Sequence, residues 1–278
     1  MPHVAAFQYF GLIILGFVVG SFGTLIGAGG GFVLMPLLLV LYPEERPETL
    51  AAISLAVVFF NTLSGSAAYA RMKRIDYKSG LMFAAATIPG AILGAVSTSF
   101  VSRRLFDGIF SVFLVVVGIA MFLKPKCEEG NAGPHIKSAH AIVCKMICAD
   151  GLSFEYSYNP VTGIVLSVFV GFLSSFLGIG GGIIHVPAMA YLLGFPVHIA
   201  TATSHFVLAI MTFTGSMVHV AQGSFHHWAL RTAALAIGVL SGAQLGAHFS
   251  NKVKGALITN SLATALVLVG IRILFEAF

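Results

Sequence analysis

Two glycine-rich runs are the residues of this sequence that point most directly to chemistry. The first run consists of Gly27, Gly29, Gly30 and Gly31. The second run has the same internal spacing and consists of Gly178, Gly180, Gly181 and Gly182. Such runs interrupt a helix because each glycine carries a large backbone entropy cost. A helix that restarts after the run directs free N–H groups and its positive dipole end at the gap, which favours an anion. Close helix packing through small residues is the alternative.

Neutral side chains around the two runs are expected to complete an anion site. The candidates for substrate contact are Ser54, Asn61, His185, Thr203, Ser204 and His205, with Ser64, Ser66, Thr214, Ser216 and Gln244 as further donors. His219 and His248 are also expected at depth in the membrane. Histidine titrates near physiological pH and could carry a coupling proton, although a neutral histidine bonded between helices is the simpler interpretation. Deep carboxylates, which a cation site would need, are missing from the predicted spans.

An internal repeat places these residues in two equivalent units. Residues 20–36 match residues 171–187 without a gap, Thr62–Ser66 is matched by Thr212–Ser216, and Gly90–Ala95 by Gly242–Ala247. Each unit contains five apolar segments. They are predicted at 5–22, 31–42, 49–70, 78–99 and 105–123, and at 160–176, 183–194, 199–220, 229–248 and 254–275. Matched breaks in two halves of a membrane protein are typical of the central site of a transporter.

The composition identifies the kind of protein that contains these units. Hydrophobic residues make up 58% of the 278 residues and charged residues only 9%, whereas about a quarter of an ordinary soluble domain is charged. This composition excludes a water-soluble enzyme. We attribute the net charge of +5 to basic loops that orient the protein in the membrane rather than to nucleic-acid binding. The sequence predicts an all-α polytopic protein of the inner cell membrane, with lipid as its surroundings.

The distribution of basic residues predicts the orientation. Five crossings per unit would invert the second unit relative to the first. Most of the 15 Lys and Arg residues then fall on one face, in the 71–78 loop, the linker and the 252–254 loop, which places this face in the cytoplasm and both termini outside. Arg103 and Arg104 oppose the bias. If the short segments after the glycines do not cross, two parallel four-span units are the alternative.

The polar linker separates the two membrane repeats. We divide the chain into repeat 1 (1–123), linker (124–158) and repeat 2 (159–278). Asp150-Gly151 between two β-compatible runs predicts a small cytoplasmic hairpin with a two-residue turn. Strand alternation would place Cys144, Met146 and Cys148 on one face. Cys127, His135 and His140 lie nearby in sequence, but no zinc spacing is present, so we expect neither a metal nor a cofactor.

The doubled glycine motif, the stretch Pro196-Val-His-Ile-Ala-Thr-Ala-Thr-Ser-His205 and the Asp-Gly hairpin together resemble the TauE/SafE family of sulfite and organosulfonate transporters. The resemblance covers essentially the whole chain. It implies transport of a sulfur-containing anion such as sulfite, thiosulfate, sulfoacetate or a related sulfonate.

We therefore expect a secondary transporter that works by alternating access, in the direction of export. A passive anion channel is the main alternative. An integral-membrane enzyme is a weaker one, because the sequence has no deep hydrolytic or metal-binding constellation. The oligomeric state is left open, with a homodimer as one arrangement.

Overall fold

The computed structural model describes residues 2–123, 142–149, 151, 153–224, 228–250 and 255–277. Within these residues the chain forms five helices, a β-hairpin and five further helices, and each expected apolar segment is confirmed as a helix. The first five helices are α1 (Pro2–Ile26), α2 (Gly31–Leu41), α3 (Pro47–Arg71), α4 (Tyr77–Thr98) and α5 (Arg103–Leu123). The last five are α6 (Pro160–Leu177), α7 (Gly182–Leu192), α8 (Val197–Ala221), α9 (Ala229–Phe249) and α10 (Gly255–Ala277).

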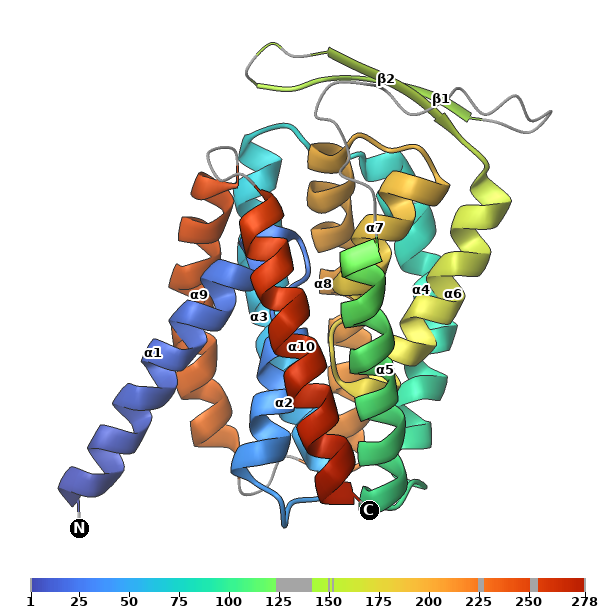
Figure 1. Ribbon diagram of the computed structural model, residues 1–278. Helices are drawn as coiled ribbons and strands as arrows, with labels where there is room; N and C mark the ends of the chain where they lie inside the picture. Colours follow the sequence, from blue (N-terminus) through green and yellow to red (C-terminus); the bar gives the residue numbers. More distant parts are fainter. Residues whose placement is uncertain are drawn as a thin grey trace.

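The helices form a bundle whose two ends differ. Both chain termini lie at one end, and the hairpin lies across the other (Figure 1). We call these the terminus end and the hairpin end. The α3–α4 turn belongs to the hairpin end, because the Ala149 N–H donates to the Met72 carbonyl at 3.1 Å. The end of α2 belongs to the terminus end (Figure 1), where Arg103 at the start of α5 donates to the Leu39 carbonyl oxygen at 3.1 Å.

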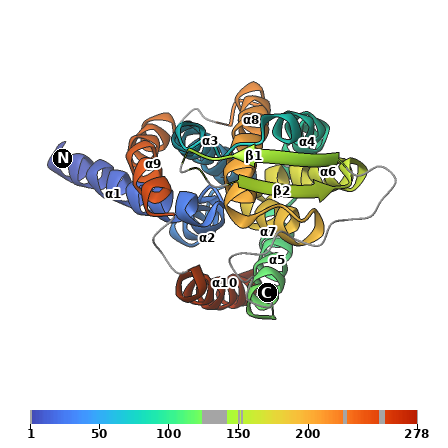
Figure 2. The ribbon, with the colours of Figure 1, turned by 90° about the horizontal axis from the view of Figure 1, so that it is seen from above.

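The main helix pairs each join a helix from before the hairpin to one from after it. α1 packs along α9, α4 along α6, α3 along α8 and α5 along α10. Viewed along the bundle, α5 and α10 lie together on one side, apart from α3 and α8 (Figure 2). Small residues bring the backbones into contact: a Cβ on Gly242 would lie 2.3 Å from the Phe17 carbonyl oxygen, and one on Gly90 would lie 2.1 Å from that of Val168.

Six helices among the described residues, α1, α3, α4, α6, α8 and α9, are long and apolar enough to cross a membrane. α2 and α7 have only 11 residues each, too few for an independent span of about 20 residues. Large apolar side chains cover the outer surface, with Phe10 60%, Leu93 62% and Phe169 59% exposed. Such a surface suits lipid rather than water, and the protein is a multi-pass membrane protein.

The linker hairpin consists of strands β1 (Ile142–Ile147) and β2 (Ser153–Tyr158). Ile147 pairs with Ser153, so five residues connect the strands and the expected two-residue turn is wrong. The longer connection follows from docking, because Ala149 bonds to the α3–α4 turn and Cys148 is buried. Cys144 and Met146 share the inward face of β1, as expected.

Candidate functional site

The two glycine runs follow the same backbone path. The φ angles of Gly27, Gly29 and Gly30 are +84°, +75° and +84°, and those of Gly178, Gly180 and Gly181 are +70°, +78° and +72°. This left-handed region favours glycine because it lacks a Cβ. Each run ends one helix and starts another, which confirms the matched helix breaks.

The two runs also pack against each other. A Cβ on Gly31 would lie 2.4 Å from the Ile179 carbonyl oxygen, and one on Gly182 would lie 2.5 Å from the Ala28 Cα. In the repeat, Gly31 is equivalent to Gly182 and Ala28 is equivalent to Ile179. The contact that Gly31 makes with the second run is therefore the same as the contact that Gly182 makes with the first run. The gap expected in front of each helix start is therefore occupied here by the opposite run. Close packing accounts for Gly31 and Gly182 in this conformation.

Histidine and serine side chains gather beside the runs, on the side of the hairpin. The Nδ1 atom of His185, in the first turn of α7, lies 3.2 Å from the Ser204 hydroxyl oxygen on α8. His205 follows, with its Nδ1 atom 3.3 Å from the Thr201 carbonyl oxygen. All three side chains are buried. Within the described structure, the Nε2 atoms of both histidines have no hydrogen-bond partner. A buried polar atom without a hydrogen bond costs free energy, and a polar ligand at this position would provide the missing hydrogen bond.

The surroundings of this cluster connect it to the first glycine run. A Cβ on Gly27 would lie 2.6 Å from Thr201 Cγ2, and one on Gly65 would lie 2.7 Å from His205 Cδ2. The Tyr69 ring meets the His205 ring edge-on at 5.3 Å. Helices α1, α2, α6, α7 and α8 contain no Asp, Glu, Lys or Arg. A ligand here would be held by neutral donors.

The other predicted site residues have separate positions. The Asn61 amide nitrogen donates to the Gly29 carbonyl oxygen at 2.9 Å, and its oxygen accepts from the Thr24 hydroxyl at 3.2 Å. Thr203 accepts from the Asp76 N–H at 3.0 Å. Ser54 is buried and has no hydrogen-bond partner among the described residues. Asn61 and Thr203 thus bond to the backbone of neighbouring segments, whereas His185 meets Ser204. His205, the next residue along α8, lies beside Gly65 and Tyr69 of α3.

The hairpin is joined to the membrane helices by a buried carboxylate, which the sequence analysis missed. The Tyr156 hydroxyl donates to Asp76 Oδ2 at 2.8 Å, and the Ser79 hydroxyl bonds both to Asp76 and to the Tyr158 hydroxyl oxygen, the latter at 2.6 Å. Phe83 links this network to the cluster, with its ring 5.7 Å from that of Tyr158 and 6.2 Å from that of His185. One feature of the sequence could have indicated this network, because Tyr156 and Tyr158 occupy alternate strand positions and therefore share one face of the hairpin.

Burial shapes the proton affinity of this network outside the membrane. It raises the pKa of Tyr158 to about 12. Burial and then the neighbouring Asp76 carboxylate raise the pKa of Tyr156, and the same two causes raise that of the Cys144 thiol. Both tyrosines therefore keep their protons to a higher pH than a free phenol does.

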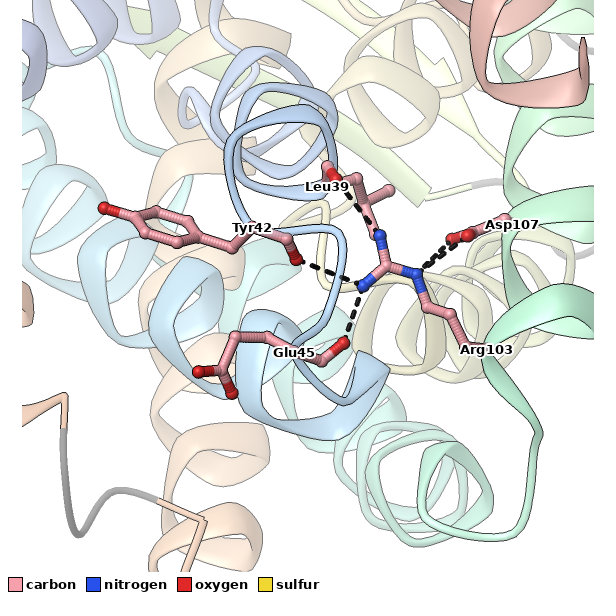
Figure 3. Close-up of polar contacts among 5 residues, drawn as sticks. All are labelled: Leu39, Tyr42, Glu45, Arg103 and Asp107. Carbon is pink, nitrogen blue, oxygen red and sulfur yellow. Dashed lines mark hydrogen bonds and ion pairs between the residues drawn. The ribbon is translucent and has the colours of Figure 1, made fainter. Parts of the chain in front are cut away.

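Arg103, which opposes the charge bias, has a structural role at the terminus end (Figure 3). Its Nε donates to Asp107 Oδ2 at 2.7 Å, and its two terminal nitrogens donate to the Glu45 and Leu39 carbonyl oxygens at 2.6 and 3.1 Å. A cation at the C-terminus of α2 meets the negative end of the helix dipole. Capping of α2 therefore accounts for this arginine.

Metal-binding side chains do not cluster in the part of the chain that the structure describes, where no group of three His, Cys, Asp or Glu residues could hold an ion. Cys127, His135 and His140 lie outside the described residues.

The sequence pattern described as "Sulfite exporter TauE/SafE" matches residues 12–273. The chain belongs to the TauE/SafE family. It is 34% identical over 272 residues to the probable membrane transporter protein YunE of Bacillus subtilis, covering 95% of this chain and 97% of that protein. A probable membrane transporter protein of Methanocaldococcus jannaschii is 26% identical over 276 residues, covering 95% and 94%. No solved structure matches this TauE/SafE chain.

Proposed function

We propose that this protein is a secondary transporter that exports a small sulfur-containing anion, such as sulfite, thiosulfate, sulfoacetate or a related sulfonate, by alternating access. The observation that carries the proposal is the buried contact of His185 with Ser204, next to His205 on α8, with an unpartnered Nε2 atom on each histidine beside two broken helices. The description of the family as a sulfite exporter supports the substrate class and the direction. The names of the relatives support transport rather than catalysis.

The chemistry of the cluster suits an oxyanion. Sulfite and sulfonates present several oxygen acceptors around one sulfur, and hydrogen bonds to a charged acceptor are stronger than neutral ones. In its neutral state the His185–Ser204 pair can supply one donor, either the His185 Nε2–H while Ser204 donates to Nδ1, or the Ser204 hydroxyl while Nδ1 donates to it. The Nδ1 atom of His205 faces the Thr201 carbonyl oxygen and carries the proton of the neutral ring, so its Nε2 atom donates to an anion only when the ring is protonated. The absence of Lys and Arg from α7 and α8 would let the anion leave again, since no fixed cation would retain it.

The alternating movement is inferred from the relation of the two halves. The contact of Gly31 with Ile179 and that of Gly182 with Ala28 are equivalent, as expected for copies related by a two-fold axis. The first half starts at the terminus end and the second at the hairpin end (Figure 1), in agreement with inverted repeats. Rocking of such halves about a central site would expose the anion to each side in turn.

The test is flux of radiolabelled sulfite and sulfoacetate in proteoliposomes. We expect saturable flux that is accelerated by substrate on the opposite side, a behaviour that a channel lacks. Ser204→Ala should weaken anion binding about tenfold or more, because a hydrogen bond to a charged group is lost. Ser97→Ala is the matched control, since the exposed Ser97 hydroxyl bonds only within α4, to the Leu93 carbonyl. Flux that does not saturate, or equal binding by both variants, would contradict the proposal.

A further inference from the structure

We propose that the second half of the chain contains a second anion-binding station, formed by Ser175 on α6 and by Ser216 and His219 on α8. It rests on the proposed function, because its ligand would be the same class of small sulfur oxyanion or sulfonate. The station lies farther toward the terminus end than the His185–Ser204–His205 cluster, since α8 runs away from the hairpin (Figure 1).

The three side chains are buried, and none of them makes a hydrogen bond of normal geometry to another described residue. Ser175 and His219 are 0% exposed and Ser216 is 4% exposed. Within the described residues, neither serine hydroxyl and neither ring nitrogen of His219 makes a hydrogen bond. The Gln222 side chain interacts with the His219 ring, although not with the geometry of a full hydrogen bond, so the ring keeps hydrogen-bonding capacity. Buried polar groups of native proteins are nearly always paired, so this set of three is suited to a polar occupant.

The first half of the same chain serves as an internal comparison. There Thr24, the counterpart of Ser175, donates to Asn61, and the Tyr69 hydroxyl donates to the Thr24 carbonyl oxygen at 2.9 Å. In the second half Met211 stands in place of Asn61 and His219 in place of Tyr69. The substitutions remove the partners that join Thr24, Asn61 and Tyr69 in the first half, so these three positions form a bonded network in one half and an open set in the other. Ser66, the counterpart of Ser216, has no hydrogen-bond partner among the described residues either.

The packing of α6 on α8 places Ser175 opposite the part of α8 that carries Ser216 and His219. A Cβ on Gly215 would lie 3.1 Å from the Ser175 hydroxyl oxygen, so that hydroxyl faces α8 at this glycine. His219 follows four residues later and therefore lies on the same helix face as Gly215. Ser216 is the next residue after Gly215.

A polar stripe on α8 connects the station to the first cluster. Residues at helical spacing along this helix are Thr201, His205, Thr212, Ser216 and His219, whereas the matching positions of α3 are Ala51, Leu55, Thr62, Ser66 and Tyr69. The 14 positions from 205 to 219 correspond to about 21 Å at ~1.5 Å per residue. An anion leaving the first cluster toward the terminus end would meet the station next.

The first test is accessibility of an introduced thiol, with Cys127, Cys144 and Cys148 replaced by serine. We expect Ser175→Cys in proteoliposomes to react with 2-sulfonatoethyl methanethiosulfonate, itself an organic sulfonate, and sulfoacetate to slow the reaction. Ser167→Cys is the matched control on α6, because the Ser167 hydroxyl is equally buried but donates to the Gly163 carbonyl oxygen at 2.7 Å. If both variants react at the same slow rate, the proposal of a second anion-binding station is wrong.

The second test transplants the bonded network. The triple change Ser175→Thr, Met211→Asn and His219→Tyr reproduces the first-half residues, and we expect it to lower sulfoacetate flux about tenfold while melting at or above the wild-type temperature. Unchanged flux in a folded triple variant would contradict the station. Absence of wild-type flux, together with faster modification at 175 than at 167, would instead refute the proposed function and retain the station as an anion-accessible site.

Discussion

Gly31 packs directly on the backbone of Ile179, and the equivalent residues Gly182 and Ala28 make the same contact from the other half. A Cβ at either glycine would approach backbone atoms, which cannot rotate away as a side chain can. The meeting point of the two broken helices is therefore fixed by backbone contact.

Adding one methyl group at this contact should destabilise the protein. We expect Gly31→Ala and Gly182→Ala each to cost about 1–3 kcal/mol, the usual cost of overpacking, or more where backbone must move. Gly11→Ala is the control, because nothing lies within 4 Å of its Cβ position. Thermal unfolding in detergent is the measurement. Equal melting of Gly31→Ala and Gly11→Ala would show that the runs separate easily.

Arg103 is expected to stabilise the end of α2. Arg103→Gln would remove the Arg103 contact of the Asp107 carboxylate and the donor to the Leu39 and Glu45 carbonyls, at a cost of about 1–3 kcal/mol. Arg46→Gln should cost close to nothing, since the Arg46 side chain is 73% exposed in its pair with Glu48. The two variants are compared by thermal unfolding at matched detergent concentration. A smaller loss at 103 than at 46 would exclude the capping role.

The docking of the hairpin should depend on pH in the alkaline range. The docked Tyr158 has a pKa of about 12, against 10.0 for a free phenol, so its contribution is complete below pH 10 and is lost as the pH rises from 10 to 12. A tyrosinate absorbance titration should show a late component that Tyr158→Phe reduces. If the variant titrates like the wild type, burial of Tyr158 in the docked hairpin does not raise the pKa of its hydroxyl.

The hairpin is expected to face the cytoplasm, because Lys145 and the loop from Arg71 to Lys78 lie at one end of the bundle. With the native cysteines replaced, Val143→Cys on the hairpin should resist an impermeant thiol reagent in intact cells and react after permeabilisation. Glu44→Cys at the terminus end should react in intact cells; both native residues are exposed. Labelling of position 143 but not of position 44 in intact cells would show that the hairpin faces the outside of the cell.

Much of the architecture could be predicted from local sequence. Apolar segments of helical length, interrupted by glycines at 27–31 and 178–182, specify the same helices and breaks that the structure contains. These features are local, since a glycine run interrupts any helix and an apolar segment enters lipid whatever its partner. Cys144 and Met146 share a strand face for the same local reason.

Tertiary structure alone decided which groups meet. Asp76 bonds to Tyr156, which lies 80 positions away, and the hairpin loop is lengthened because Ala149 docks on the α3–α4 turn. Sequence spacing also could not distinguish Thr203, which bonds to Asp76, from its neighbour Ser204, which faces His185. Adjacent helix positions point about 100° apart, so the packing of α7 and α4 around α8 determines which of the two hydroxyls lies beside a histidine and which holds a loop.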